Sequence, residues 1–217
     1  MHERQTSIYL IRHADTKPDA DLAFADANEY DDLPLNARGL EQAAALARRL
    51  GETLDLRAIY SSAAKRAQQT ARALATAFGL GVEIDQRLRE VALSAPSIEH
   101  LPLSERGAVV RAHLENLAVI AMRDGSWSAL PGTEPAAKIR ERMREGIDAI
   151  AARHPGQAVA AVSHAGSINA FVADLLGIQR DFFFPAGNTS VTVVRYTDYG
   201  KILVRLNDTA HLESLRV

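Results

Sequence analysis

The chain has 217 residues, of which 47% are hydrophobic and 24% are charged, and its formal net charge is −2. This length suits a single domain, and the composition is that of an ordinary soluble globular protein with a sizeable core. The near-neutral charge argues against a broad surface that binds nucleic acid or anionic membranes, but it does not exclude a local basic pocket. The sequence contains no cysteine, which excludes disulfides, thiolate catalysis and thiolate metal sites.

No apolar run approaches the ~20 residues that a membrane span requires. Residues 1–5 carry no apolar signal-peptide segment. We therefore expect a cytoplasmic protein with neither nucleic acid nor membrane as a partner. The sequence does not exclude that the protein forms a homodimer.

The first part of the chain alternates strand and helix patterns. A buried strand is predicted at 7–12 and a long polar loop at 15–32. Asn36 is expected to cap a helix that ends near Leu50, with Gly51 as its stop. The apolar stripe of that helix is predicted to consist of Leu40, Ala43, Ala44, Ala47 and Leu50. A strand at 57–60, a helix from about 63 that ends at Gly79 and an edge strand at 82–84 follow.

The second part begins with a less regular stretch, about 91–131, which we expect to be a variable cap or insertion. One helix is predicted in it, at about 105–122, with Val109, Val110, Leu114, Leu117 and Ala121 facing inward. Thr133 is expected to cap the next helix, which runs to about Ala152 and turns Ile139, Met143, Ile147 and Ile150 to the core. A strand at 158–163, a helix at about 167–176 that ends at Gly177, and β segments at 190–196 and 202–206 complete the chain.

Strands that alternate with helices predict a three-layer α/β/α sandwich with a mostly parallel central sheet, formed by one domain that spans 1–217. In such sheets ligands bind beyond the carboxyl ends of the strands. Side chains that follow a strand directly are therefore the first candidates for a functional site.

Two histidines occupy that position. His13 follows the apolar run 8–11, and His164 follows the apolar run 158–162. A neutral imidazole nitrogen can attack phosphorus and hold the phosphoryl group, and the planar guanidinium of Arg12 suits phosphate oxygens. A second imidazole at 164 would stabilise charge on the phosphoryl oxygens, at the start of a helix whose N-terminus favours anions. The alternatives are a solvated loop at His13 and a hydrogen-bonded core histidine at His164.

Arg66 lies at a third junction between a strand and a helix. A cation near a helix N-terminus is disfavoured by the helix dipole, so this arginine requires a compensating anion. An exposed helix face is the more common place for a single arginine, but the position favours a second guanidinium at the same edge of the sheet.

Together these segments resemble the histidine phosphatase superfamily, also called the phosphoglycerate mutase-like family, over nearly the full length of the chain. The first and last of its central motifs are similar to Leu10-Ile11-Arg12-His13-Ala14 and Ser163-His164-Ala165-Gly166. Its other segments resemble Leu33-Pro34-Leu35 with Gly39-Leu40-Glu41-Gln42-Ala43, the stretch Ser62 to Ala71 around Arg66, and Asn207 to Leu212. One such motif is weak, but four in the family's order are highly specific.

The resemblance implies a phosphoglycerate mutase-like fold and a role for each matching residue. His13 would be the phosphorylated nucleophile, while Arg12, Arg66 and His164 would bind the phosphoryl group. Glu90 aligns with the family's proton donor, which protonates the leaving oxygen and later helps to deprotonate water.

A second, weaker carboxylate candidate is Glu134, although an acid in a first helical turn is also favoured by the helix dipole. Arg142 belongs to the same segment, and a structural role is expected for it.

Three positions depart from the family pattern. Ala14 stands where the family often has glycine, so the turn after His13 must keep φ negative. Asp19 falls near a phosphate-contacting asparagine of many members, and a carboxylate there would repel phosphate. Residues 91–96 lack the usual Gly-x-Trp-Glu-Gly continuation, which makes the wall next to Glu90 unusual.

The function predicted is hydrolysis of a phosphate monoester through phosphohistidine, without a metal or cofactor, on a small phosphorylated metabolite or a phosphoprotein. Mutase-type phosphoryl transfer is the first alternative, but the chain lacks the glycine- and tryptophan-bearing stretch that glycolytic members use after their first motif. A catalytically weak phospho-ligand-binding module is the second. A metal-dependent hydrolase that uses His13, Asp15, Glu90 and His164 is disfavoured because a dication would compete with the guanidiniums.

Overall fold

The computed structural model of the chain describes residues 5–16, 32–94, 96–130 and 132–215. Asp19 and most of the predicted polar loop lie outside the described residues. The described part contains a sheet of six strands with helices on both faces.

The sheet has the order β3-β2-β4-β1-β5-β6. Its strands are β1 (Thr6–Arg12), β2 (Leu56–Ser61), β3 (Glu83–Ile84), β4 (Ala158–Ser163), β5 (Val191–Thr197) and β6 (Gly200–Asp208). The neighbours β3, β2, β4 and β1 are parallel, whereas β5 is antiparallel to β1 and β6 to β5. Strand β4 is apolar from Ala158 to Val162 because a central parallel strand is buried on both faces. The mostly parallel sheet predicted from the sequence is confirmed.

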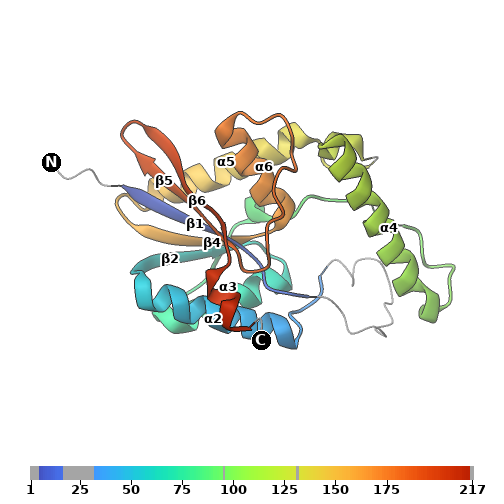
Figure 1. The fold of residues 1–217 in the computed structure, drawn as a ribbon, viewed down its shortest axis with the longest axis horizontal. Helices are drawn as coiled ribbons and strands as arrows, with labels where there is room; N and C mark the ends of the chain where they lie inside the picture. Colours follow the sequence, from blue (N-terminus) through green and yellow to red (C-terminus); the bar gives the residue numbers. More distant parts are fainter. Residues whose placement is uncertain (1–4, 17–31, 95, 131, 216–217) are drawn as a thin grey trace.

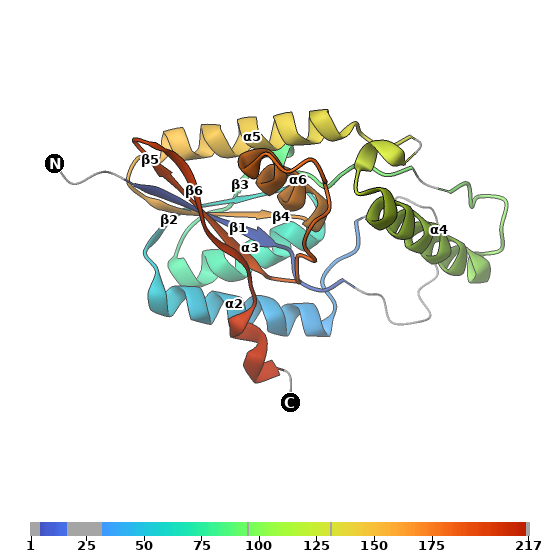
Figure 2. The ribbon, with the colours of Figure 1, turned by 45° about the horizontal axis from the view of Figure 1, so that its top comes forward.

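Helices α2 (Ala37–Thr53) and α3 (Lys65–Phe78) cover one face of the sheet, while α5 (Ala136–Arg153) and α6 (Ala165–Leu176) cover the other (Figures 1 and 2). Successive residues of β1 point to opposite faces, so that Ile8 and Leu10 pack with α5 and α6 while Ile11 packs with α2 and α3. This arrangement is the predicted three-layer sandwich. Helix α4 (Leu103–Asp124) stands apart, beyond the carboxyl ends of β1 and β4.

The start of α2 is as predicted, and its inward face is as predicted only in part. Asn36 caps the helix through a hydrogen bond from the Gly39 N–H at 2.7 Å. Ala43, Ala47 and Leu50 are buried as predicted, whereas Leu40 is 57% exposed and Ala44 is also exposed, contrary to the prediction. The helix is rotated about its axis relative to the predicted orientation, because Gly39 and Gln42 pack on the backbone of Asp15. It also passes Gly51 and ends at Thr53, so the predicted stop is wrong.

Helix α4 is two residues longer at each end than predicted, and only part of its expected apolar face is covered. Val110, Leu117 and Ala121 are buried, whereas Val109 is 37% exposed, which contradicts the prediction. The reason is that α4 extends away from the sheet and packs along one narrow face.

Thr133 does not cap α5, contrary to the prediction. The helix begins at Ala136 with Pro135 at its N-cap position. The ring of Pro135 disfavours helical backbone angles at Glu134, so the helix starts after the proline. The inward face was predicted correctly, since Ile139, Met143, Ile147 and Ile150 are all buried.

The remaining helix ends agree more closely with the sequence. Gly79 and Gly177 end α3 and α6 in the left-handed region, with φ of +65° and +67°. Helix α6 begins at Ala165, earlier than predicted, because His164 takes the extended N-cap position. No helix of the described residues is long and apolar enough to cross a membrane.

Candidate active site

The two histidines are brought together by the register of β1 and β4. Arg12 pairs with Ser163 across these parallel strands, so His13 and His164 leave the sheet side by side. The His13 N–H donates to the Ser163 carbonyl at 3.0 Å. The two imidazole centroids are 5.2 Å apart, and the ring planes lie at 60°. The juxtaposition expected from the sequence is present.

The imidazole of His13 is held by a hydrogen bond at one of its two ring nitrogens. Its Nδ1 lies 2.7 Å from the carbonyl oxygen of Ala14. Because a carbonyl only accepts, this bond places the proton on Nδ1 and leaves the lone pair on Nε2. Burial lowers the pKa of His13 well below its ordinary value, and the charges of His164, Arg66 and Arg12 lower it further. The imidazole is therefore neutral at neutral pH, as a nucleophile must be.

His164 is fully buried and is oriented by Ser62, which follows the neighbouring strand β2. Its Nε2 lies 2.7 Å from Ser62 Oγ, while its Nδ1 has no hydrogen-bond partner among the described residues. Burial lowers the pKa of His164 well below the ordinary value, with further lowering by Arg66, Arg12 and Arg142. The ring thus carries a buried nitrogen available to a ligand.

Two guanidiniums share this edge of the sheet. Arg12 donates through Nη1 to the Ala186 carbonyl at 2.6 Å, and its buried Nε has no partner within the described residues. Burial lowers the pKa of Arg12, an effect that Glu90 and Asp15 oppose and Arg66 adds to. Arg66 is the second residue of α3, and its charge also acts on His13 and His164. Arg12 is the last residue of β1, and Arg66 lies in the first turn of α3.

Glu90 sits at the N-terminus of α6. Its Oε1 accepts the Ser167 N–H at 3.1 Å and the Val91 N–H at 2.9 Å, and its Oε2 lies 3.4 Å from the Gly166 nitrogen. A helix N-terminus favours an anion, and here the Glu90 carboxylate of the chain itself occupies that position. Its charge raises the pKa of Arg12.

Gly166 leaves room for that carboxylate. A Cβ at this position would meet Trp127 Cζ2 at 2.6 Å, Glu90 Oε1 at 2.8 Å and Val91 Cγ2 at 2.9 Å. The absence of a side chain on Gly166 permits the close packing of Glu90 and Trp127.

Glu134 and Arg142 form a clamp around the segment that carries Glu90. Both carboxylate oxygens of Glu134 accept from Arg89, at 2.7 and 3.0 Å, and Arg142 also binds them. Arg142 donates further to the carbonyls of Arg87 and Arg89, at 2.8 and 2.9 Å, and lies 3.2 Å from that of Glu90. Arg142 has the expected structural contacts, and those of Glu134 are with arginines rather than with either site histidine.

Comparison with known proteins decides the family. The sequence model of the histidine phosphatase superfamily (branch 1) matches residues 8–209. The chain belongs to this superfamily. The resemblance drawn from the motifs is confirmed, and so is the expectation of a phosphatase-type hydrolase.

Relatives cover nearly the whole chain. Phosphoserine phosphatase 1 of Hydrogenobacter thermophilus is 30% identical over 217 residues, which cover 94% of this chain and 93% of that protein. The probable phosphoglycerate mutase GpmB of Cronobacter sakazakii is 28% identical over 215 residues, 95% of each protein. Among solved structures, YhfR of Bacillus stearothermophilus superposes with a TM-score of 0.77 at 25% identity, covering 96% of this chain and 100% of that one. The phosphoglycerate mutase-like fold is thereby confirmed.

Several superfamily motif residues that were given no role in the sequence hold the turn after His13. Gln42 Oε1 accepts the Asp15 N–H at 2.9 Å, and Thr70 Oγ1 accepts the Ala14 N–H at 3.0 Å. A Cβ on Gly39 would lie 2.1 Å from the Asp15 carbonyl oxygen, so only glycine fits there. The spacing of these residues within the superfamily motifs was the signal in the sequence that could have indicated this role. Ala14 keeps a negative φ, as its side chain requires.

Thr189 is a site residue that no sequence signal indicated. It is fully buried, has a φ of +54°, and directs its N–H to the His13 carbonyl at 3.3 Å. A β-branched residue in the left-handed region is strained, and such strain often occurs beside functional groups. The contact fixes the backbone of the candidate nucleophile from the β5 side.

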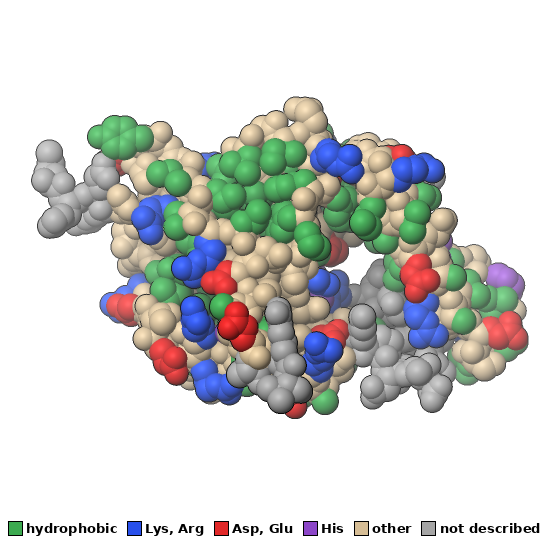
Figure 3. Space-filling view, in the orientation of Figure 1, with side chains coloured by type: hydrophobic (Ala, Val, Ile, Leu, Met, Phe, Trp, Pro, Cys, Tyr) green, Lys and Arg blue, Asp and Glu red, His purple; other side chains and the backbone are tan. Residues whose placement is uncertain are grey.

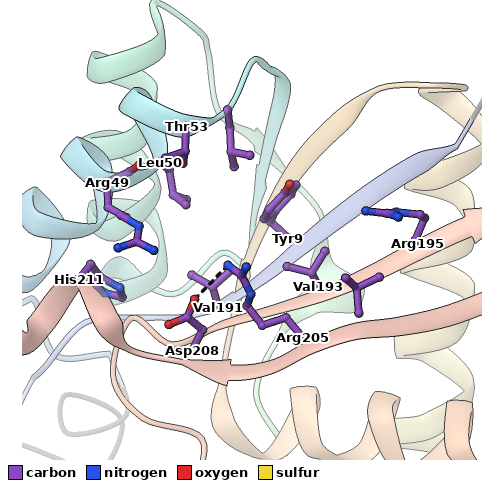
Figure 4. A pocket seen from close by; sticks show the side chains of 12 residues that line it. Tyr9, Arg49, Leu50, Thr53, Val191, Val193, Arg195, Arg205, Asp208 and His211 are labelled. Carbon is purple, nitrogen blue, oxygen red and sulfur yellow. Dashed lines mark hydrogen bonds and ion pairs between the residues drawn. The ribbon is translucent and has the colours of Figure 1, made fainter.

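Two further observations delimit the site. Within the described ranges, no group of three or more His, Asp or Glu side chains is placed to hold a metal ion, and His13, Asp15, Glu90 and His164 do not form one. A separate cavity of about 300 Å³ lies between α2 and the β5–β6 hairpin, with Arg49, Arg195 and Arg205 around it (Figure 4). None of the predicted site residues lines it.

Proposed function

We propose that this enzyme hydrolyses phosphate monoesters through a phosphohistidine on Nε2 of His13. The observation that carries the proposal is the orientation of the two imidazoles. His13 Nδ1 is bound to Ala14, while Arg12 Nε and His164 Nδ1 are buried nitrogens without partners among the described residues. An unsatisfied buried polar group costs about 1–3 kcal/mol, and phosphoryl oxygens would accept from both. The arrangement favours a bound phosphoryl group between the rings.

The first half-reaction follows from these contacts. Arg12, Arg66 and His164 bind the phosphoryl oxygens, and the lone pair on His13 Nε2 attacks phosphorus as the ester P–O bond breaks. The departing oxygen takes a proton from the carboxylic acid form of Glu90. The alcohol leaves, and the phosphoryl group stays on nitrogen.

The second half-reaction restores the enzyme. The Glu90 carboxylate takes a proton from water as the water oxygen attacks phosphorus. The P–N bond breaks, its electron pair returns to His13 Nε2, and inorganic phosphate leaves. Glu90 is protonated again, so no metal or cofactor is required in either step. Return of the phosphoryl group to an acceptor other than water would make the same site a mutase.

The wider assignment rests on the relatives and on the chain's organisation. We infer that a small phosphorylated metabolite is the substrate, because the named relatives include phosphoserine phosphatases. We also propose that residues 91–131, which contain α4, form a cap over the site, and that the protein is cytoplasmic.

The test is turnover of p-nitrophenyl phosphate in the presence of EDTA. We expect His13→Ala to lower kcat/KM by at least about 10³-fold, because the nucleophile is lost. Protein mixed with substrate and denatured should carry phosphate that is labile in acid and stable in base. His154→Gln is the matched control, since His154 lies at the opposite end of β4.

A wild-type protein with neither turnover nor acid-labile phosphate would contradict the proposal and favour a binding module. Conversion of 3-phosphoglycerate in a coupled assay would identify a mutase instead.

A further inference from the structure

An apolar cavity of about 680 Å³ lies between α4 and the segment 182–185. Its walls include Leu93, Leu117, Trp127, Phe182, Phe183 and Phe184, and the one charged residue among those that line it is Arg180. Figure 3 shows hydrophobic side chains both over the middle of this face and on α4, with the surface hollowed between them. Cavities of this size and lining commonly bind small molecules.

The cavity adjoins the proposed catalytic groups on two sides. Trp127 Cζ2 and Glu90 Oε1 lie 2.6 and 2.8 Å from one point, the Cβ position of Gly166. The tryptophan wall is therefore close to the acid that would protonate the leaving oxygen. On the other side, Phe184 and Pro185 lead directly to Ala186, whose carbonyl binds Arg12. A substrate with its phosphoryl group at His13 would have its alcohol part beside this cavity.

Buried polar anchors fix the wall that Trp127 and the segment 182–184 form. Asn169 of α6 is 1% exposed; its Oδ1 accepts from the backbone N–H groups of Phe183 and Phe184, and its Nδ2 donates to the Phe184 carbonyl. Asp181 is fully buried and accepts from the backbone N–H of Trp127 at 3.0 Å. The ring of Trp127 packs on Phe182 with centroids 3.8 Å apart. A wall held in this way keeps that side of the cavity preformed, which favours binding.

The chemistry of the lining selects against small polar alcohols. An ammonium group on the alcohol would lose its hydration there and would meet the like charge of Arg180, which is costly. Arg180 already donates to the Met122 carbonyl at 2.8 Å. An aryl group or a long or branched alkyl group instead gains free energy for each apolar group that leaves water.

We propose that the natural substrate is a phosphate monoester of a bulky apolar alcohol, whose aryl or alkyl group occupies this cavity. The proposal rests on the proposed function, since it requires the phosphoryl group between His13 and His164. In this proposal the cavity determines which alcohol part of the substrate is accepted, and α4 forms one wall of the substrate-binding site.

The test compares primary alkyl phosphates, whose alcohols have nearly equal acidity and therefore nearly equal reactivity as leaving groups. Each buried methylene contributes about threefold to fourfold in affinity. We expect kcat/KM to rise at least about tenfold from ethyl phosphate to hexyl phosphate, and O-phospho-L-serine to be a poorer substrate than hexyl phosphate.

Matched variants on α4 locate the effect. Ala118 lines the cavity, and Ala118→Trp should fill it and bring the hexyl-to-ethyl ratio close to one. Val119 is the next residue, is 65% exposed and does not line the cavity. Val119→Trp should therefore keep the wild-type ratio. Equal loss of the ratio in both variants would overturn the assignment.

A binding measurement separates this inference from the catalytic proposal. The sequence has one tryptophan, so intrinsic tryptophan emission reports on Trp127 in the cavity wall. Hexylphosphonate, which is not hydrolysed, should change that emission at lower concentration than ethylphosphonate does.

Absence of this difference overturns the inference, as does equal turnover of ethyl and hexyl phosphate. Preference for O-phospho-L-serine also overturns it, while the phosphatase proposal stands. If no phosphate ester is hydrolysed, the phosphatase proposal fails and this inference fails with it, even where hexylphosphonate binds.

Discussion

Single residues set the chemistry of this site through burial and neighbouring charge. His13 and His164 are buried side by side among arginines, and both have lowered pKa values for that reason. A neutral His13 keeps its lone pair at a pH where a phosphate monoester is a dianion. In the proposed mechanism Arg12 and Arg66 supply the positive charge for that dianion, so the imidazoles need not supply it.

We expect neither imidazole to titrate near pH 6.5 in the folded protein. Burial and the neighbouring charges lower the folded pKa of both, while the unfolded chain has the ordinary value of about 6.5. Between these values the unfolded state binds protons that the native state does not, so stability is lost as pH falls from about 6.5 toward the folded pKa values. Above pH 6.5 these two groups leave stability unchanged.

Imidazole resonances, assigned by comparison with His13→Ala, provide the measurement. The same resonances in urea supply the reference titration. Either ring titrating at the ordinary value in the native protein would show that the site is more open to water than the structure indicates.

Secondary-structure elements bring residues distant in the sequence to the same edge. Both histidines, Arg12 and Arg66 could be predicted because each follows a strand or starts a helix, and the parallel register then places them together. The contacts of Glu134 and Arg142 with the segment that carries Glu90 could not be predicted, because they depend on which loop packs beside α5. The inward face of α2 was predicted only in part for a similar reason, since Gln42 turns inward to bind the backbone after His13.

At the scale of elements, Gly166→Ala should separate the Glu90 segment from α6. The added Cβ would push on Trp127 and Glu90, and displacements of about 1 Å in a catalytic group can cost 10²-fold in rate. We expect kcat/KM, which reports the transfer to His13 before Glu90 acts as a base, to fall about 10- to 100-fold on ethyl phosphate. The fall should be smaller on p-nitrophenyl phosphate, whose leaving group needs no proton.

The control is Gly51→Ala in α2, where an added Cβ meets nothing within 4 Å. It should keep full activity and stabilise the helix slightly. Equal losses on both substrates for Gly166→Ala would argue that the glycine serves packing alone and that Glu90 does not act as the acid.

At the scale of the whole molecule, arginines gather both at the candidate active site and around a separate cavity. The candidate active site lies at the carboxyl ends of β1 and β4, and the arginine-lined cavity of Figure 4 lies between α2 and the β5–β6 hairpin. Charge alone does not tell which of them takes phosphate. The second contains Asp208, which pairs with Arg205 at 3.0 Å, so part of its positive charge is neutralised. The first combines arginines with unpartnered buried nitrogens.

Binding of inorganic phosphate to the folded state should therefore stabilise the whole protein through the first site. A ligand at 100 times its Kd adds about 2.7 kcal/mol, which raises Tm by about 5–10 °C for a domain of this size. Arg66→Ala should remove most of that shift because it withdraws a guanidinium that acts on both histidines. Arg195→Ala, which alters the cavity of Figure 4, should keep it. Thermal unfolding with and without phosphate measures both variants, and the reverse pattern would place the anion between α2 and the hairpin, away from His13.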